Sequence, residues 1–455
     1  MEHDADEKTY DKGKTNVCKK IYFTFIGFIY FFFAVIGLIA CENNVVAEEP
    51  STVEVDDLSS SSNSSSSSLS PYPESFKPDS QEYPYAGIPR IVIETEYRTI
   101  VNDRESEIPA KLQIWGKKEA ESDILDLTIR GRGNTSWENM PKKSYKIEFS
   151  KKQSFLEMPS NKDWVLQANY ADKTLLKNYL VFQLAKWLGS AYPPRCEFAE
   201  LYLNGEYLGV YLIIESIKQG KNRVNISDND SYIVEFDCKK KTSDVGTWSK
   251  AGKFLNVHYP KQPTDSELNI LRSEINRIEN ILQNRSFDES TLSSLFDLDA
   301  YISYYWIQEF SKNPDAFFAT SVYFSWEVGK PLKMGPVWDF DLAFGVHSEE
   351  NKRVFSGWFI NQYYWNIDLF SDNSFKNMVA EYWEKHRNVF SSTLDSLEIY
   401  RDFLYPAANN NFKRWNILKN TQYVYFRNAY STYGEAVDDM MDWIRLRINW
   451  IENNL

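Results

Sequence analysis

The sequence predicts an α+β protein with a strand-rich N-terminal half and a helix-rich C-terminal half. Apolar and polar residues alternate in several segments between positions 88 and 236, which is the period of half-buried strands. From Ser266 onward, apolar residues recur mainly at helical spacing. Because the two patterns occupy separate parts of the chain, we expect two lobes with a cleft between them, where ligands commonly bind.

The expected elements of the first half are mostly strands. Alternation predicts strands over residues 88–99, 110–115, 124–129, 143–149, 163–169 and 232–236. Asp172 suits the start of a helix that Gly189 would end. Asn204-Gly205 separates two further apolar segments and is the strongest short signal for a β-hairpin.

The second half is expected to be mainly helical. Helical spacing runs from Ser266 to about Phe310, and a hairpin is expected over residues 323–334. Beyond Phe375 the chain again shows helical spacing and ends in a long amphipathic helix.

The N-terminus predicts export from the cytoplasm. Residues 21–40 are almost wholly apolar, follow two lysines and end in Leu-Ile-Ala before Cys41. This pattern favours a bacterial lipoprotein signal over residues 1–41, with Cys41 as the lipidated residue. The alternative is a single membrane-spanning anchor, since the apolar stretch is about long enough to cross a bilayer.

Composition predicts that a flexible linker follows Cys41. Residues 42–87 are acidic and contain a serine tract, so they bury too little apolar surface to offset their ordering entropy. The folded domain would then span residues 88–455. We expect it outside the cytoplasm, lipid-anchored to a bacterial membrane at the outer membrane or cell surface.

Charge and cysteine content exclude some classes of protein. The net charge of -13, with no compensating basic stripe, argues against a nucleic-acid partner. Four cysteines and four histidines, all scattered, argue against a zinc site. Cys196 and Cys238 are the cysteines of the folded part, and the sequence leaves open whether they form a disulfide.

The most informative motif covers residues 335–345. Asp339 and Asp341 stand one residue apart in an otherwise apolar run that a glycine closes. Ionised carboxylates among apolar groups need a partner, and Mg²⁺ or Mn²⁺ prefers such hard oxygen ligands. The alternative is a buried loop in which the two aspartates cap a helix or pair with lysines.

Other candidate residues precede this motif in a suggestive order. They are Arg132 in a glycine-containing turn, Lys146 on a strand, Glu215 at the end of an apolar strand and Asp315 between a helix and a hairpin. The order resembles that of a protein kinase, with a phosphate loop, a strand lysine, a lobe-crossing segment, a catalytic aspartate and a metal-binding aspartate. The His-Arg-Asp and Asp-Phe-Gly motifs are missing, so the order alone is an analogy.

Several longer strings are similar to those of the CotH kinase family, over roughly residues 88–455. They are residues 130–137, 141–146, 164–170, 203–211, 232–237 and 338–341. The resemblance implies an atypical protein-kinase-like, two-lobed fold. It also implies transfer of the γ-phosphoryl group of ATP, with Mg²⁺ or Mn²⁺, to serine or threonine of exported or surface proteins.

The resemblance also implies roles for individual residues. Asp315 would be the catalytic base, Asp339 a metal ligand and Asp341 a second ligand or an orienting group. Lys146 would contact phosphate, with Lys142 and Lys143 as alternatives. Glu215 would approach the nucleobase.

Two further positions bear on the implied nucleotide site. Trp338 or a neighbouring aromatic residue would stack on adenine. Kinases usually place a metal-binding asparagine shortly after the catalytic aspartate, where this chain has Ala319-Thr320-Ser321. That departure puts two-metal catalysis in doubt, although Thr320 or Ser321 could ligate through a hydroxyl.

Two other functions stay open. The first is a non-catalytic surface binding or adhesion lipoprotein, with aromatic residues lining a groove. The candidate aromatic residues are Tyr304, Tyr305, Trp306, Trp358, Tyr363, Tyr364 and Trp365. The second is a metal-dependent hydrolase built on Asp339 and Asp341, with His347 as its support.

Overall fold

The computed structural model describes residues 70–238, 244–285, 287–422 and 428–455. The predicted signal segment, with Cys41, and most of the predicted linker lie outside these residues. Residues 71–87 belong to the compact unit Pro71–Leu455, although composition assigns them to the linker. Phe76 is buried there against Val92, Tyr202 and Tyr207, so this unit begins earlier than the sequence predicts.

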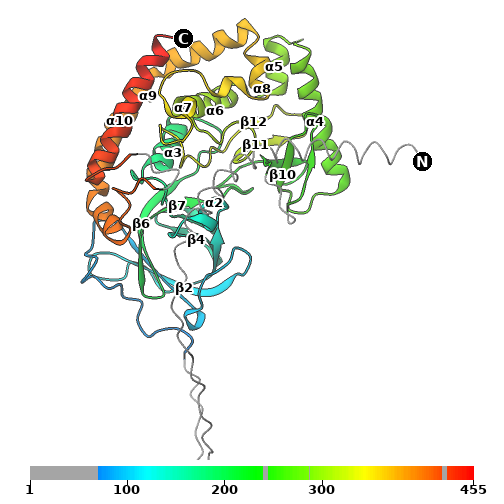
Figure 1. The fold of residues 1–455 in the computed structure, drawn as a ribbon. Coiled ribbons are helices and arrows are strands. Elements are labelled where there is room, and N and C mark those ends of the chain that lie inside the picture. Colours follow the sequence, from blue (N-terminus) through cyan, green and yellow to red (C-terminus); the bar gives the residue numbers. More distant parts are fainter. Residues whose placement is uncertain (1–69, 239–243, 286, 423–427) are drawn as a thin grey trace, which may run out of the picture. The chain divides into compact units, whose positions relative to one another are not determined.

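The first half of this unit is a closed seven-stranded barrel with the order β1-β2-β3-β4-β5-β7-β6 (Figure 1). Its strands are β1 (Arg90–Thr95), β2 (Ile108–Trp115), β3 (Leu125–Arg132), β4 (Ser144–Phe155), β5 (Met158–Gln167), β6 (Cys196–Leu203) and β7 (Glu206–Glu215). Neighbouring strands are antiparallel except β1 and β6, which pair in parallel and close the barrel. Alternate residues point inward, and Ile93, Ile129, Ile147 and Trp164 are among the fully buried side chains of the barrel core.

The hairpin signal at Asn204-Gly205 is confirmed. These two residues connect β6 to β7, and both have positive φ, 52° and 82°. Two adjacent positive φ values match the backbone twist of tight hairpins, and glycine takes such a φ without strain.

The second half contains a smaller sheet with the order β12-β11-β8-β10-β9. Its strands are β8 (Ser231–Phe236), β9 (Gly246–Trp248), β10 (Phe254–Tyr259), β11 (Val322–Glu327) and β12 (Lys333–Met334). The longer helices are α3 (Lys177–Trp187), α4 (Asp265–Gln283), α6 (Leu298–Ser311), α9 (Asn373–Arg414) and α10 (Tyr433–Glu452). Short helical segments are η1 (Glu96–Arg98), α2 (Thr135–Asn139), α5 (Glu289–Leu295), α7 (Glu350–Arg353), η2 (Ile360–Gln362) and α8 (Trp365–Leu369).

The predicted α+β class, with a strand-rich N-terminal half and a helical C-terminal part, is confirmed. Barrel closure was not predicted, because the β1–β6 pairing joins segments about a hundred residues apart and alternation carries no information on such partners. The strands β9 and β10 were also missed. In the part of the chain that the structure describes, no helix combines the length and apolar character needed to cross a membrane.

Aromatic residues of the helical part are mainly core residues. Tyr304, Tyr305, Trp306 and Trp365 are each at most 5% exposed and belong to one large apolar cluster. They therefore cannot line an open groove. Cys196 is buried, Cys238 is exposed, and no disulfide joins these two thiols.

A buried polar contact joins the barrel to helix α9. The ammonium of Lys142 donates to the carbonyl oxygen of Val210 and to Oδ1 of Asn411, the latter at 2.9 Å. Asn411 Oδ1 also accepts the N–H of Val210 at 3.1 Å. A Cβ atom on Gly209 would come within 2.4 Å of the same oxygen, so glycine is required where α9 meets β7.

Replacement of Asn411 with alanine should destabilise the protein. It would leave the ammonium of Lys142 and the N–H of Val210 buried without this acceptor, which costs about 2–4 kcal/mol. Asn409 lies on the exposed side of the same helix, so Asn409→Ala should change stability by less than about 0.5 kcal/mol. Denaturant unfolding of the full chain measures both, and equal effects of the two variants would contradict this account.

Candidate functional site

The two aspartates of the apolar motif lie in a turn that follows β12. Residues of the barrel and of α3 hold Asp341. Its Oδ1 accepts from Asn178 Nδ2 at 2.5 Å and from Gln167 Nε2 at 3.4 Å. The ammonium of Lys177 donates to the backbone oxygen of Asp341 at 3.1 Å. The first turn of α3 and the end of β5 therefore fix the position of this carboxylate.

Asp172 stabilises the start of α3 at Lys177. Its Oδ2 accepts the N–H of Lys177 at 2.9 Å, and its Oδ1 accepts the N–H of Thr174 at 2.9 Å. A carboxylate at a helix start satisfies otherwise free N–H groups. Asn178 in turn accepts the N–H of Phe340 at 2.9 Å, so α3 contacts both the backbone and a side chain of the aspartate turn.

Asp339 is held from the opposite side, by residues around β11 and α6. Asn313 Nδ2 donates to its backbone oxygen at 3.1 Å, and the hydroxyl of Ser321 donates to Oδ2 at 3.0 Å. Asp339 has a φ of 69°, a left-handed conformation that is unfavourable for a residue with a side chain. These contacts hold the backbone in that conformation.

Asp315 lies in the turn after α6, two residues after Asn313. Its N–H donates to Oδ1 of Asn313 at 3.2 Å, while the amide nitrogen of the same Asn313 donates to Asp339. One asparagine side chain therefore joins the turn that carries Asp315 to the turn that carries Asp339.

Arg132, at the end of β3, lies near Asp339. Its guanidinium lies over the ring of Trp338 at 4.9 Å from the ring centre. Burial lowers the pKa of Arg132, and Tyr323, Asp339 and Glu235 lie near enough to oppose that shift. The guanidinium has no hydrogen bond or ion pair with any described residue, so its donors are available to an anion.

Trp338 packs against Arg132, which leaves little of its ring open to a nucleobase. It is 6% exposed, and its ring contacts both the guanidinium of Arg132 and the ring of Phe182, whose centre is 6.0 Å away. The sequence predicted adenine stacking for this residue. The structure instead places it beneath the guanidinium.

The glycine-containing turn serves packing. A Cβ atom on Gly131 would come within 2.4 Å of the ring of Trp137. The N–H of Gly131 donates to the backbone oxygen of Asp103 at 2.8 Å, so it is not available to an anion. From this turn, it is Arg132 that reaches the candidate site.

The three candidate lysines are engaged elsewhere. Lys146 forms ion pairs with Asp163 at 3.0 Å and with Glu148 at 3.5 Å. Lys142 is buried against Val210 and Asn411, and Lys143 donates to the backbone oxygen of Trp137. Lys146 still shares a face of the sheet with Gln167, because it pairs with Val165, two residues before Gln167 on β5.

Glu215 lies in a different setting from the aspartate turn. One of its oxygens pairs with Arg195 at 2.8 Å and with Arg223 at 2.5 Å, and the other accepts the N–H of Arg195. It pairs across the sheet with Trp164, a residue of the barrel core, and so lies on the opposite face from Gln167. These contacts place Glu215 in an ion-pair cluster of the barrel.

The charges of the two aspartates fit a divalent cation. Burial, and after it the neighbouring charge of Asp339, raise the pKa of Asp341 to about 7, against the hydrogen bond from Asn178 and the charge of Lys177. Neutral amides and one hydroxyl hold the carboxylates, and no lysine or arginine forms an ion pair with them among the described residues. A divalent cation would relieve this repulsion through hard oxygen ligands.

The chain supplies part of a coordination shell. Within the described ranges, no three His, Cys, Asp or Glu side chains converge on a point that could hold a metal ion. Mg²⁺ commonly takes one or two carboxylates and completes its shell with water and substrate phosphates. The pair Asp339 and Asp341 fits that mode of binding.

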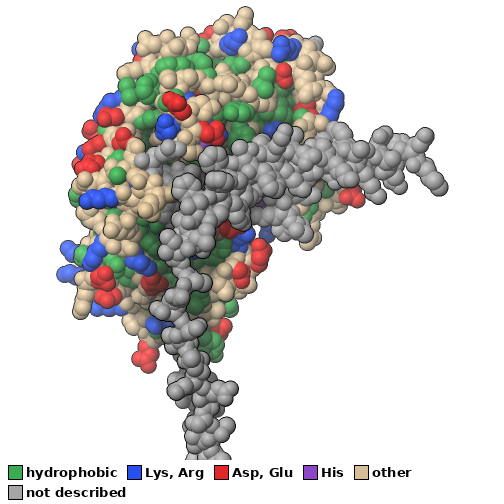
Figure 2. Space-filling model, in the orientation of Figure 1, with side chains coloured by type: hydrophobic (Ala, Val, Ile, Leu, Met, Phe, Trp, Pro, Cys, Tyr) green, Lys and Arg blue, Asp and Glu red, His purple; other side chains and the backbone are tan. Residues whose placement is uncertain are grey.

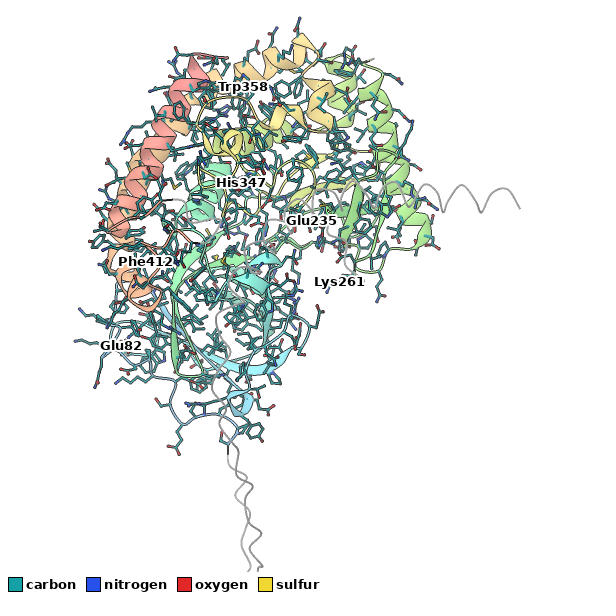
Figure 3. All side chains as sticks on the ribbon, in the orientation of Figure 1. Glu82, Glu235, Lys261, His347, Trp358 and Phe412 are labelled. Atoms are coloured by element: carbon teal, nitrogen blue, oxygen red, sulfur yellow. The ribbon has the colours of Figure 1, made fainter. Side chains whose placement is uncertain are left out.

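Sequence reasoning missed several residues that build this site. They are Gln167, Asn178, Glu235, His258, Asn313 and Tyr323. Glu235 is a buried acid inside the apolar strand β8, and Figure 3 shows it between the barrel strands and the helical part. A single charged residue in an apolar strand was the available signal. The amide side chains of Gln167, Asn178 and Asn313 gave no signal, because they reach the aspartates through strand register and packing between segments distant in the sequence.

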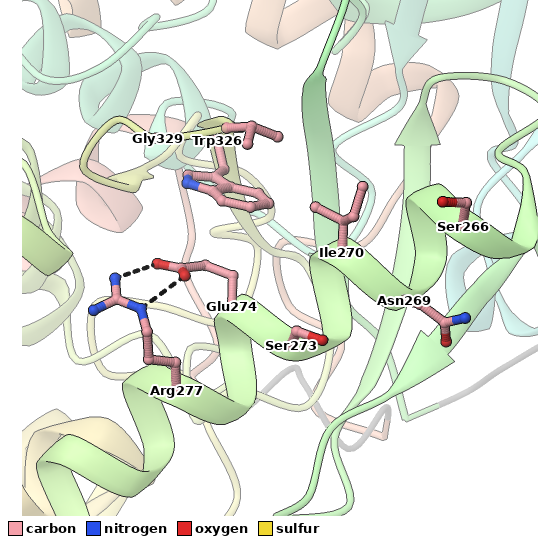
Figure 4. Close-up of a pocket in the computed structure, with 9 residues that line it drawn as sticks. Ser266, Asn269, Ile270, Ser273, Glu274, Arg277, Trp326 and Gly329 are labelled. Atoms are coloured by element: carbon pink, nitrogen blue, oxygen red, sulfur yellow. Dashed lines mark hydrogen bonds and ion pairs between the residues drawn. The ribbon is translucent and has the colours of Figure 1, made fainter.

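A groove lies on the other face of the smaller sheet (Figure 4). It is a shallow groove of about 710 Å³ between α4 and the end of β11, and its lining includes Trp326 and the Glu274–Arg277 ion pair. Trp326 pairs with Tyr232 on β8, whereas Tyr323 pairs with Glu235. Residues three apart on a strand face opposite ways, so this groove is separate from the aspartate turn.

Comparison with known proteins places this geometry in a family. A family model described as CotH kinase protein matches residues 129–451. The chain belongs to the CotH kinase protein family. The match begins within β3, includes Arg132, Asp315 and both aspartates, and ends in α10, so the family resemblance seen in the sequence is confirmed.

The chain is also similar to a curated protein, the inner spore coat protein H of Bacillus subtilis (strain 168). The chain is 27% identical to it over 256 residues, which are 53% of this chain and 64% of the relative. The chain thus spans less than two thirds of the length of the relative.

The pKa of Asp341 gives this CotH family member a testable pH dependence. In metal-free buffer the folded protein retains a proton that the unfolded chain, with a pKa of about 3.9, has already released. The stability that this bound proton contributes is therefore present at low pH and is lost as the pH rises through about 7. Asp341→Asn removes this loss, so the variant should gain roughly 1–3 kcal/mol relative to the wild type between pH 5 and 8.

Urea unfolding at a series of pH values, with a chelator present, measures this difference. Asp126→Asn changes an exposed aspartate on β3 and serves as the control. A stability difference between Asp341→Asn and wild type that stays constant from pH 5 to 8 would contradict the raised pKa.

Proposed function

We propose that this protein is an atypical kinase that transfers the γ-phosphoryl group of ATP to serine or threonine of exported or surface proteins. The observation that carries the proposal is the approach of Arg132 to Asp339, whose charge also acts on Asp341. A guanidinium with free donors and two carboxylates without a cationic partner lie together there. A triphosphate with a divalent cation complements both charges.

The distribution of the candidate residues over the barrel and the helical part supports this proposal. The barrel contributes Arg132 and Gln167, and the helical part contributes Asp315, Asp339 and Asp341. In kinases, likewise, phosphate-contacting groups and metal-binding aspartates come from different parts of the chain. Here we assign the phosphate-contacting role to Arg132 in place of Lys146, because Lys146 is paired with Asp163.

The proposed reaction assigns a step to each group. Asp339 and Asp341 would hold Mg²⁺ or Mn²⁺, which lowers the negative charge that phosphate oxygens present to the acceptor. Arg132 binds a non-bridging phosphate oxygen. Asp315 orients the acceptor hydroxyl and takes its proton while the hydroxyl oxygen bonds to the γ-phosphorus. The bond from that phosphorus to the bridging oxygen of ADP breaks, and ADP leaves with the electron pair.

A location outside the cytoplasm has two supports. The expected export signal ending at Cys41 is one, and the similarity to a protein named as a spore coat component is the other. The visible face of the folded part carries acidic and basic side chains interspersed (Figure 2). Such a surface suits a protein acceptor, although it does not identify one.

Nucleotide binding should stabilise the protein in a metal-dependent way. At a hundred times its Kd, ATP with Mg²⁺ should add about 2.7 kcal/mol of stability, and the effect should vanish without the metal. Asp339→Ala and Arg132→Ala should each abolish the gain, because they remove a cation ligand and a phosphate contact. Thermal unfolding with and without ATP and Mg²⁺ measures this effect.

The control for nucleotide binding is Asp126→Ala, an exposed aspartate paired with Lys111, which should retain the full gain. If millimolar ATP and Mg²⁺ leave the unfolding temperature of the wild type unchanged, the proposed function is wrong.

Phosphoryl transfer should depend on Asp315 separately from binding. Asp315→Ala should lower transfer of labelled γ-phosphate to dephosphorylated casein by at least about a hundredfold, the usual contribution of a general base. It should keep the thermal stabilisation by ATP, since Asp315 is not assigned to the cation. Full activity in this variant would remove Asp315 from the mechanism.

A further inference from the structure

A buried carboxylate on the smaller sheet faces the aspartate turn. Glu235 is 8% exposed and lies among apolar residues of β8. Burial alone raises the pKa of such a group. His258, Tyr323 and the N–H of Ser321 together outweigh this effect and hold the pKa of Glu235 below its usual value. Glu235 therefore keeps a negative charge in the interior, where an ion is costly unless it has partners.

Three partners occupy both oxygens of Glu235. The hydroxyl of Tyr323 donates to Oε2 at 2.9 Å, and Nε2 of His258 lies 2.9 Å from the same oxygen. The backbone N–H of Ser321 donates to Oε1 at 3.0 Å. Residues of β10, β11 and the segment before β11 thus meet at one side chain of β8.

Ser321 connects Glu235 to the cation-binding turn. Its backbone N–H is held by Glu235, and its hydroxyl donates to Oδ2 of Asp339 at 3.0 Å. Both Ser321 and Asp339 have positive φ, 57° and 69°. Each such residue costs on the order of 1 kcal/mol or more and persists only when its surroundings hold it. The bond from Ser321 to Glu235 is one of the contacts that hold it.

We propose that Glu235 is a positioning residue that acts through Ser321 on Asp339. Glu235 fixes the backbone of Ser321, and Ser321 directs its hydroxyl to Oδ2 of Asp339. Oδ1 of Asp339 has no hydrogen-bond partner among the described residues and is left for a divalent cation. This inference rests on the proposed function only in that Asp339 must bind the cation.

The role differs from that of the Thr320 or Ser321 ligand considered from the sequence. Ser321 here donates a proton to a carboxylate, so it orients a ligand instead of serving as one. Partners of metal-ligating carboxylates of this kind typically change metal affinity 10–100-fold when they are removed.

Binding of Mn²⁺ alone to the full chain tests the proposal without any reaction. Water-proton relaxation measures the Kd for the wild type, Glu235→Leu, Ser321→Ala and the double variant. Each single variant should raise the Kd at least about tenfold. The double variant should bind no more weakly than the weaker single variant, because both changes break one chain of contacts.

Two further variants separate positioning from general destabilisation. Glu235→Gln keeps an oxygen that can accept from Ser321 N–H, so its Kd should lie between those of wild type and Glu235→Leu. Glu200→Leu removes another fully buried carboxylate, one that accepts from Tyr207 and Asn410 far from this turn, and should leave the Kd unchanged. Circular dichroism checks that each variant is folded, and Ser321→Ala carries the test if Glu235→Leu does not fold.

The possible results distinguish failure of the positioning role from failure of the cation site. Wild-type affinity in folded Glu235→Leu and Ser321→Ala, or additive effects in the double variant, overturns the positioning role while leaving the proposed function intact. Failure of the wild type itself to bind Mn²⁺ overturns the cation site, and both proposals fall with it.

Discussion

The repulsion between two carboxylates one residue apart is the constraint on which the site depends. Burial and the neighbouring charge of Asp339 together raise the pKa of Asp341 to about 7, because a second negative charge in this turn is costly without a compensating cation. The surrounding protein does not neutralise them. It holds them with the amides of Gln167, Asn178 and the hydroxyl of Ser321, which fix positions without supplying positive charge. The negative charge of this turn is the feature on which the proposed cation site rests.

Both halves of the molecule are needed to impose that constraint. The barrel ends β5 at Gln167 and leads through Asp172 into the first turn of α3, which holds Asp341. The smaller sheet and the turn after α6 hold Asp339 from the other side. Arg132, which forms no ion pair with the described residues, brings a guanidinium from the end of β3 and packs against Trp338. The site thus lies where segments that are distant in the sequence meet.

What could be predicted from the sequence follows from how local each signal is. The strands, the Asn204-Gly205 turn and the aspartate pair all show in windows of a few residues, and the structure contains them. The partner of Lys146 does not show, because Asp163 is its neighbour only through strand pairing. Barrel closure and the approach of Glu235 to Ser321 are hidden for the same reason. Periodicity predicted the α+β class and the longer motifs predicted the family, while the contacts of single residues required coordinates.

The contact between Lys142 and Asn411 has a consequence for biosynthesis. Burial lowers the pKa of Lys142 well below its ordinary value, and its acceptor side chain lies 269 residues further along the chain. At usual ribosomal speeds this separation corresponds to roughly 15–50 s of translation. Until α9 emerges, the lysine has no such acceptor, and the part of β7 that contacts α9 stays uncovered. A nascent barrel must therefore wait for the C-terminal helices, and ribosome stalling late in the message would leave it exposed to proteases and chaperones.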